Sequence, residues 1–97
     1  MPPTDRNKLR KPDTRLMTIL ADNIKGYRRA LRLSQEDLAE ACGLHRTYVG
    51  SVERCERNVT LSTLEAFSSA LGVSVPDLLT KQTSYEGHSN ARGTAVR

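Results

Sequence analysis

Side chains able to read a DNA base gather at the start of one short predicted helix, at residues 46–53. The planar guanidinium of Arg46 carries two donors that match O6 and N7 of guanine, and Thr47 can hydrogen-bond a base or contact a thymine methyl group. Tyr48 can reach a phosphate or a thymine. Val49 and Val52, three residues apart, anchor the helix and leave four side chains on faces free to meet a partner: Arg46, Thr47, Tyr48 and Ser51. The alternative is an ordinary solvated helix face, and the elements around these residues decide between the two.

A second helix and a tight turn precede this one. Ser34 is a good N-cap, and Asp37 stands three residues later, where a capping-box acid belongs, so a helix is predicted over 34–42. Gly43 can adopt the left-handed conformation that ends a helix, and the next helix begins at about residue 46. Two helices joined by a short turn that contains glycine form a helix-turn-helix, whose second helix enters the major groove of DNA.

Apolar residues spaced by three and four predict helices through the rest of the central segment, and no stretch alternates long enough for a strand. The predicted fold class is all-α. The additional helices are expected at 16–31, at 61–71 after the cap Thr60, and in a short segment after the cap Ser74, with Pro76 in its first turn. We expect a domain at 15–82 between a flexible basic N-terminal tail at 1–14 and a flexible C-terminal tail at 83–97.

Composition excludes several classes of protein. With 97 residues, 37% hydrophobic, and no Trp, the chain is too small for a deep enclosed pocket. No Gly-rich phosphate loop, Ser/His/Asp set or acid pair in a cleft is evident, so we expect no enzyme, no cofactor and no small-molecule substrate. No apolar run exceeds three residues, which excludes a membrane span and favours a soluble, cytoplasmic protein.

The net charge of +4 says little by itself, because the excess lies in the two ends of the chain. Residues 16–80 carry seven basic and eight acidic side chains. The N-terminal run RNKLRK could be an arm that reaches the minor groove, or only a solubilising tail.

The two cysteines do not form a recognisable site. Cys42 is predicted to face the core as a small apolar residue. Cys55 lies in a basic loop where a thiol could be oxidised, although a thiol without function is the favoured interpretation. Together with His45 they lack the paired spacing of a zinc site, and no metal is expected.

The stretch SQEDLAEACGLHRTYVGSVERCERNVTLSTLEAFSSALGV resembles the Xre/Cro-type helix-turn-helix family of phage and bacterial repressors. The motifs SQEDLA, RTYVGSVERCERN and TLSTLEAFSSALGV recur in order with fixed spacing, and the resemblance spans about Ile24 to Leu79. HRTYVGSVERCERNVTLSTLE is most similar to the controller proteins of restriction–modification systems. The resemblance implies five helices of the lambda-repressor type, binding operator DNA as a homodimer.

Several residue roles follow from the resemblance. It implies that Gln35 contacts a phosphate, that Arg57 and Asn58 contact DNA from the loop after the recognition helix, and that Glu53 pairs within the protein. Arg28 and Arg29 are either solvated charges or phosphate contacts that position the DNA backbone. The full predicted DNA-binding set is Gln35, Arg46, Thr47, Tyr48, Ser51, Arg54, Arg57, Asn58 and Arg28. Surplus apolar surface near the C-terminal end predicts a dimer interface, or only core, at Phe67, Leu71, Val75, Leu78 and Leu79.

The sequence departs from the family pattern at two positions where glycine is usual, Arg32 and Cys55. If both keep a left-handed backbone, each costs roughly 1–2 kcal/mol; otherwise the turns have relaxed. The alternative to a DNA-binding regulator is an antitoxin or adaptor whose main partner is a protein. RNA binding is a weak third candidate, because the chain has only one Phe and three Tyr to stack on bases.

Overall fold

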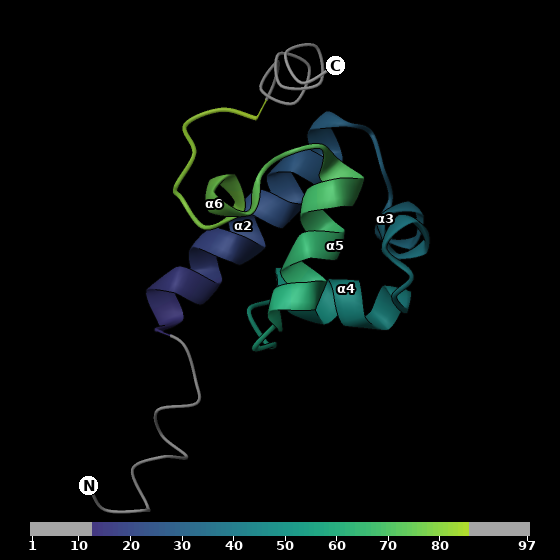
Figure 1. Ribbon diagram of the computed structural model, residues 1–97, viewed down its shortest axis with the longest axis horizontal. Coiled ribbons are helices and arrows are strands. Elements are labelled where there is room, and N and C mark those ends of the chain that lie inside the picture. Colours follow the sequence, from purple (N-terminus) through teal and green to yellow (C-terminus); the bar gives the residue numbers. More distant parts are fainter. Residues whose placement is uncertain (1–12, 86–97) are drawn as a thin grey trace, which may run out of the picture.

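Five helices follow one another in the computed structural model, which describes residues 13–85. They are α2 (Thr14–Ala30), α3 (Gln35–Cys42), α4 (Arg46–Glu53), α5 (Leu61–Leu71) and α6 (Val75–Leu78). No strand occurs within the described range, so the predicted all-α fold class is confirmed. Figure 1 shows α5 in front of α2, with α4 along the lower edge and α3 to the right. None of these five helices has the length and apolar character that crossing a membrane requires.

Side-chain caps start the helices. The Ser34 hydroxyl accepts a hydrogen bond from the Asp37 N–H at 2.9 Å, and the Asp37 carboxylate accepts one from the Ser34 N–H at 3.0 Å. These hydrogen bonds complete the predicted capping box and hold the pKa of Asp37 below its ordinary value. α2 begins at Thr14, slightly before the predicted start, because the Asp13 side chain accepts from the Arg15 N–H at 2.8 Å.

Four of the helices end in a residue with a left-handed backbone. Gly43 (φ 70°) and Gly72 (φ 71°) follow α3 and α5, as predicted. Arg32 (φ 61°) and Cys55 (φ 64°) take the same conformation after α2 and α4. A side chain at such a position costs roughly 1–2 kcal/mol, because its Cβ crowds the backbone. The two departures from the family's glycines have therefore kept the strained turn.

The core forms where the helices meet, and it includes most of the predicted dimer interface. Ile24, Tyr27 and Val49 are fully buried in it. Phe67 and Leu78, both fully buried, and Leu71, which is 1% exposed, also lie in it. These three residues are unavailable to a second subunit, so their assignment to the interface is corrected. Val75 and Leu79 are half-buried against this core.

Tyr85, predicted to lie in the C-terminal tail, packs against α2. Its ring meets the Tyr27 ring edge-on with centroids 4.9 Å apart, and its hydroxyl donates to Asn23 Oδ1 at 2.8 Å. Asn23 in turn donates to the Leu78 carbonyl at 2.8 Å, and the absent side chain of Gly26 leaves room for the Tyr85 ring. Burial raises the pKa of Tyr85. The packed domain thus extends to Tyr85, past the predicted boundary at 82. Of the tails predicted at 1–14 and 83–97, residues 1–12 and 86–97 lie outside the described residues.

Candidate nucleic-acid interface

The first turn of α4 is exposed and carries residues predicted to meet DNA. Arg46 and Thr47 are exposed, and Tyr48 is half-buried. Val49 and Val52 lie on the opposite side of the helix, in the core, as predicted. When such a helix enters the major groove, its N-terminal residues face the base edges. The side chains of this turn that are expected to contact DNA are therefore accessible to a partner.

His45 fixes the start of α4 in a way that the sequence analysis did not predict. Its Nδ1 accepts a hydrogen bond from the Thr47 N–H at 3.1 Å, so the imidazole is the N-cap of the helix. This bond requires an unprotonated Nδ1. His is not one of the residues preferred at an N-cap, so its position just before the helix was the only signal in the sequence.

Ser51 lies inside the protein and not on a free face of α4. Only 4% of the residue is exposed. Its hydroxyl donates to the Tyr48 carbonyl oxygen at 2.7 Å and accepts from Arg57 Nε at 2.9 Å. The expected direct contact of Ser51 with DNA is therefore corrected, because the side chain is covered and its hydroxyl is engaged. The reason lies in how the loop after α4 folds back, which residue spacing does not reveal.

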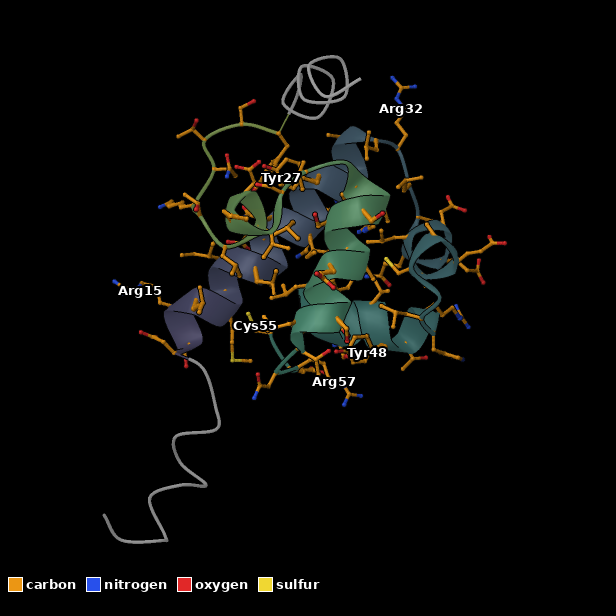
Figure 2. The ribbon with its side chains drawn as sticks, in the orientation of Figure 1. Arg15, Tyr27, Arg32, Tyr48, Cys55 and Arg57 are labelled. Carbon is orange, nitrogen blue, oxygen red and sulfur yellow. The ribbon has the colours of Figure 1, made fainter. Side chains whose placement is uncertain are left out.

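Arg57 and Asn58 are exposed in that loop. The guanidinium carbon of Arg57 lies 5.2 Å from the centroid of the Tyr48 ring, which is a cation–π contact. Tyr48 and Arg57 consequently lie side by side at the lower edge of the molecule (Figure 2). The structure thus brings one loop residue of the predicted DNA-binding set onto the face of α4.

Arg54 is paired with an acidic neighbour. Its Nε lies 3.0 Å from Glu56 Oε2 and its Nη2 lies 3.2 Å from Glu56 Oε1. The hydrogen bonds from Arg54 lower the pKa of Glu56. Both side chains are more than half exposed, so water screens the attraction between their charges. Arg54 can therefore exchange Glu56 for a phosphate at little cost.

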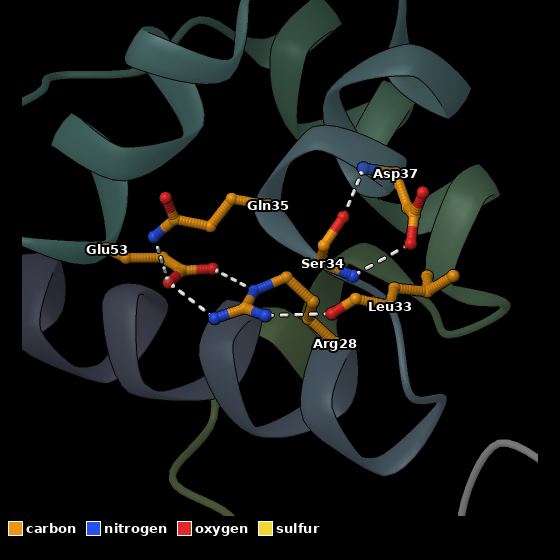
Figure 3. Close-up of polar contacts among 6 residues, drawn as sticks. All are labelled: Arg28, Leu33, Ser34, Gln35, Asp37 and Glu53. Atoms are coloured by element: carbon orange, nitrogen blue, oxygen red, sulfur yellow. Dashed lines mark hydrogen bonds and ion pairs between the residues drawn. The ribbon is translucent and has the colours of Figure 1, made fainter.

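Arg28, by contrast, is committed to the interior. Its Nε donates to Glu53 Oε2 at 2.7 Å and its Nη2 donates to Glu53 Oε1 at 3.0 Å, while its Nη1 donates to the Leu33 carbonyl at 2.8 Å (Figure 3). The Arg28 side chain is only 10% exposed. The expectation of a solvated charge or phosphate contact is corrected, because all three of its nitrogens donate within the protein. Its place four residues after the buried Ile24, on the apolar stripe of α2, was the signal that could have revealed this.

Glu53 joins three helices. Besides holding Arg28 of α2, its Oε1 accepts a hydrogen bond from Gln35 Nε2 of α3 at 3.0 Å (Figure 3). The Glu53 side chain is 3% exposed, and the internal pairing implied for it is confirmed. Gln35 itself is exposed at the first turn of α3, where the resemblance implies a phosphate contact. The network therefore ties the orientation of α4 to that of α3.

The two thiols each contact another part of the protein. Burial raises the pKa of Cys42, which suppresses the reactive thiolate and fits the predicted role as a small apolar residue. Cys55 Sγ lies 3.5 Å from Thr18 Oγ1. Within residues 13–85, no three His, Cys, Asp or Glu side chains come together as a metal site would require.

Known proteins similar to this chain include a control protein, a hypothetical transcription factor and a restriction–modification controller protein. Residues 24–78, more than half of the chain, match the helix-turn-helix family. The control protein C.SmaI of Serratia marcescens is 66% identical over 64 residues, which cover 66% of this chain and 76% of that protein. The crystal structure of the hypothetical transcription factor NHTF from Neisseria is 44% identical with a TM-score of 0.67, covering 73% of this chain and 83% of that one. The restriction–modification controller protein C.Esp1396I, bound to a 25 base pair operator site, is 36% identical with a TM-score of 0.60, covering 65% of this chain and 83% of that one.

Proposed function

The chain belongs to the helix-turn-helix family, and from that premise we propose that it is a sequence-specific DNA-binding regulator of transcription that controls a restriction–modification operon. As a member of this family it is a regulator and not an enzyme. The similarity to a control protein and to a controller protein bound to its operator supports both the DNA target and the operon.

The exposed first turn of α4 is the observation that carries this proposal. Arg46 and Thr47 have no role in the core, whereas Val49 behind them is fully buried. A base edge in the major groove is the partner that fits an arginine fork and a short hydroxyl at the start of a helix. Arg46 is the residue proposed to discriminate bases, and Gln35 is proposed to position the DNA backbone.

The proposed active form is a homodimer. The apolar side chains still exposed supply a surface for it, above all Leu61, 77% exposed, and Leu16, 39% exposed. Leu16 also lines a groove together with Val59 and Leu79. To read a palindrome with half-sites one helical turn apart, the proposed isologous dimer must hold its two α4 helices about 34 Å apart.

Selection of binding sites from a random DNA library tests the proposal directly. The wild-type protein should enrich one palindromic sequence, and Arg46→Ala should bind that duplex about 5- to 150-fold more weakly, the range expected for one bidentate base contact. Binding to a shuffled duplex of the same length should change little. Arg29→Ala is the matched control for charge: Arg29 is exposed on α2, and its loss should change the affinity for the selected and the shuffled duplex by the same small factor.

Two outcomes would contradict the proposal. Enrichment of no sequence at moderate salt would exclude a sequence-specific regulator and would favour the antitoxin or adaptor. Equal losses on the selected and the shuffled duplex would show that Arg46 contributes only charge. The assignment to a restriction–modification operon has its own check, since the selected site should occur upstream of adjacent methyltransferase and endonuclease genes.

A further inference from the structure

Two contacts hold Arg57 against α4, and a third orients the hydroxyl that takes part in one of them. Its Nε donates to Ser51 Oγ at 2.9 Å, its guanidinium lies 5.2 Å from the centroid of the Tyr48 ring, and the Ser51 hydroxyl donates to the Tyr48 carbonyl at 2.7 Å. The Ser51 hydroxyl has a single proton, and because that proton goes to Tyr48, a lone pair of the oxygen is left for Arg57. We call this closed arrangement of Tyr48, Ser51 and Arg57 the arginine clamp.

The partners of Arg57 in the clamp are neutral, which distinguishes it from its neighbours. Arg28 bonds the carboxylate of Glu53, and Arg54 bonds that of Glu56. The hydroxyl and the aromatic ring that orient the Arg57 guanidinium carry no charge, and the Glu56 carboxylate, which is hydrogen-bonded to Arg54, acts on Arg57 only as a nearby charge. The bond to Ser51 uses only Nε, so the two terminal nitrogens keep the fork that matches a pair of acceptors on DNA.

We propose that Ser51 is a positioning residue, which presents the fork of Arg57 to the DNA as a second arginine contact beside Arg46. This inference rests on the proposed function, because it requires DNA to lie against α4. A free arginine loses rotamer freedom when it binds, a loss that weakens binding by about 2- to 12-fold. A clamped arginine has already lost that freedom in the unbound protein.

The bonding of Ser51 does not serve α4 itself. A serine hydroxyl that donates to the carbonyl three residues earlier slightly destabilises a helix, since it competes with the backbone ladder. The buried Ser51 hydroxyl instead fixes the position of Arg57, six residues further along the chain, by accepting a hydrogen bond from its Nε. The role of Ser51 should therefore depend on Arg57 and disappear when Arg57 is absent.

A double-mutant cycle tests this dependence. The probe is the duplex that the wild-type protein selects from a random library, and binding is followed by fluorescence anisotropy. Ser51→Ala should weaken binding by about 2- to 12-fold. In the Arg57→Ala background the same change should alter binding by less than about two-fold, because no side chain is left to position. Ser69→Ala, at an exposed serine of α5, is the matched control and should bind as the wild type does.

A conservative variant separates positioning from charge. Arg57→Lys keeps the positive charge and loses the Nε that bonds Ser51. It should bind more weakly than the wild type, and Ser51→Ala should weaken it by less than about two-fold further. Thermal unfolding of every variant checks that the fold is intact.

Two results would overturn the inference. One is an equal loss from Ser51→Ala with and without Arg57, which would assign Ser51 to the helix alone. The other is no loss from Ser51→Ala in an otherwise wild-type protein that selects a sequence. Failure of the wild type to select any sequence would remove the proposed function first, so the two failures are distinguishable.

Discussion

Replacing Arg32 by glycine should stabilise the domain. Arg32 ends α2 with a φ of 61°, and its side chain is exposed, so the substitution removes little packing. The turn itself is held by backbone bonds, from the Arg32 N–H to the Arg29 carbonyl at 2.9 Å and from the Leu33 N–H to the Arg28 carbonyl at 3.0 Å. Glycine keeps both bonds and removes the Cβ that crowds the backbone.

Two opposing effects set the magnitude for Arg32→Gly. Relief of the left-handed conformation contributes roughly 1–2 kcal/mol. The greater freedom of glycine in the unfolded chain takes back about 0.4–1 kcal/mol. The net gain lies between about 0 and 1.6 kcal/mol, and its middle value of about 0.8 kcal/mol raises Tm by about 3–6 °C for a domain of this size. Cys55→Gly should gain somewhat less, because it also loses the contact with Thr18.

Thermal unfolding followed by far-UV circular dichroism measures these changes, and the chain contains its own control. Gly43 and Gly72 end α3 and α5 at φ 70° and 71°, and a Cβ built on either would meet no atom within 4 Å. Alanine at these positions therefore changes only the backbone preference, and it should lower Tm by an amount similar to the gain at Arg32. The reasoning is refuted if Arg32→Gly melts at or below the wild-type temperature while Gly72→Ala is also without effect.

Two further substitutions test other parts of the fold. Glu53→Ala should lower the free energy of unfolding by about 3–5 kcal/mol in a urea titration, because it leaves the buried Arg28 charge unpaired; a loss below about 1 kcal/mol would show that Arg28 finds water instead. Gly26→Ala should destabilise the wild type by about 1–3 kcal/mol, since the new Cβ would lie 2.2 Å from the Tyr85 ring. In a Tyr85→Ala background the same change should stabilise by about 1 kcal/mol through helix propensity, and the same sign in both backgrounds would contradict the packing of Tyr85 on α2.

Local signals in the sequence predicted most of the helix boundaries, because caps act over three or four residues. Ser34 with Asp37 and the glycines at 43 and 72 stand at helix ends as expected. The spacing of Val49 and Val52 likewise predicted their burial, whereas Ser51, expected on a free face of α4, is buried as well. Such signals are dependable where the capping residue and the helix end that it determines lie within one helical turn of each other.

The predictions that were wrong concern side chains whose contacts lie in distant segments of the chain. Arg28 pairs with a carboxylate 25 residues away, and Tyr85 bonds a side chain 62 residues away. Ser51 is covered by a loop residue whose position follows from the strained turn at Cys55. Residue spacing does not predict the path that a loop takes over a helix, so the sequence does not distinguish an exposed serine from a buried one.

The polar network around Glu53 explains why α4 can present its first turn in a fixed orientation. Apolar burial of Val49 and Val52 is not directional, so by itself it would allow α4 to rotate or slide on the core. Hydrogen bonds are directional, and Glu53 receives them from Arg28 on α2 and from Gln35 on α3. One end of α4 is thereby fixed to both neighbouring helices. The opposite end is left to its cap and to the solvent, which is the arrangement that a helix needs when its tip must fit a rigid groove.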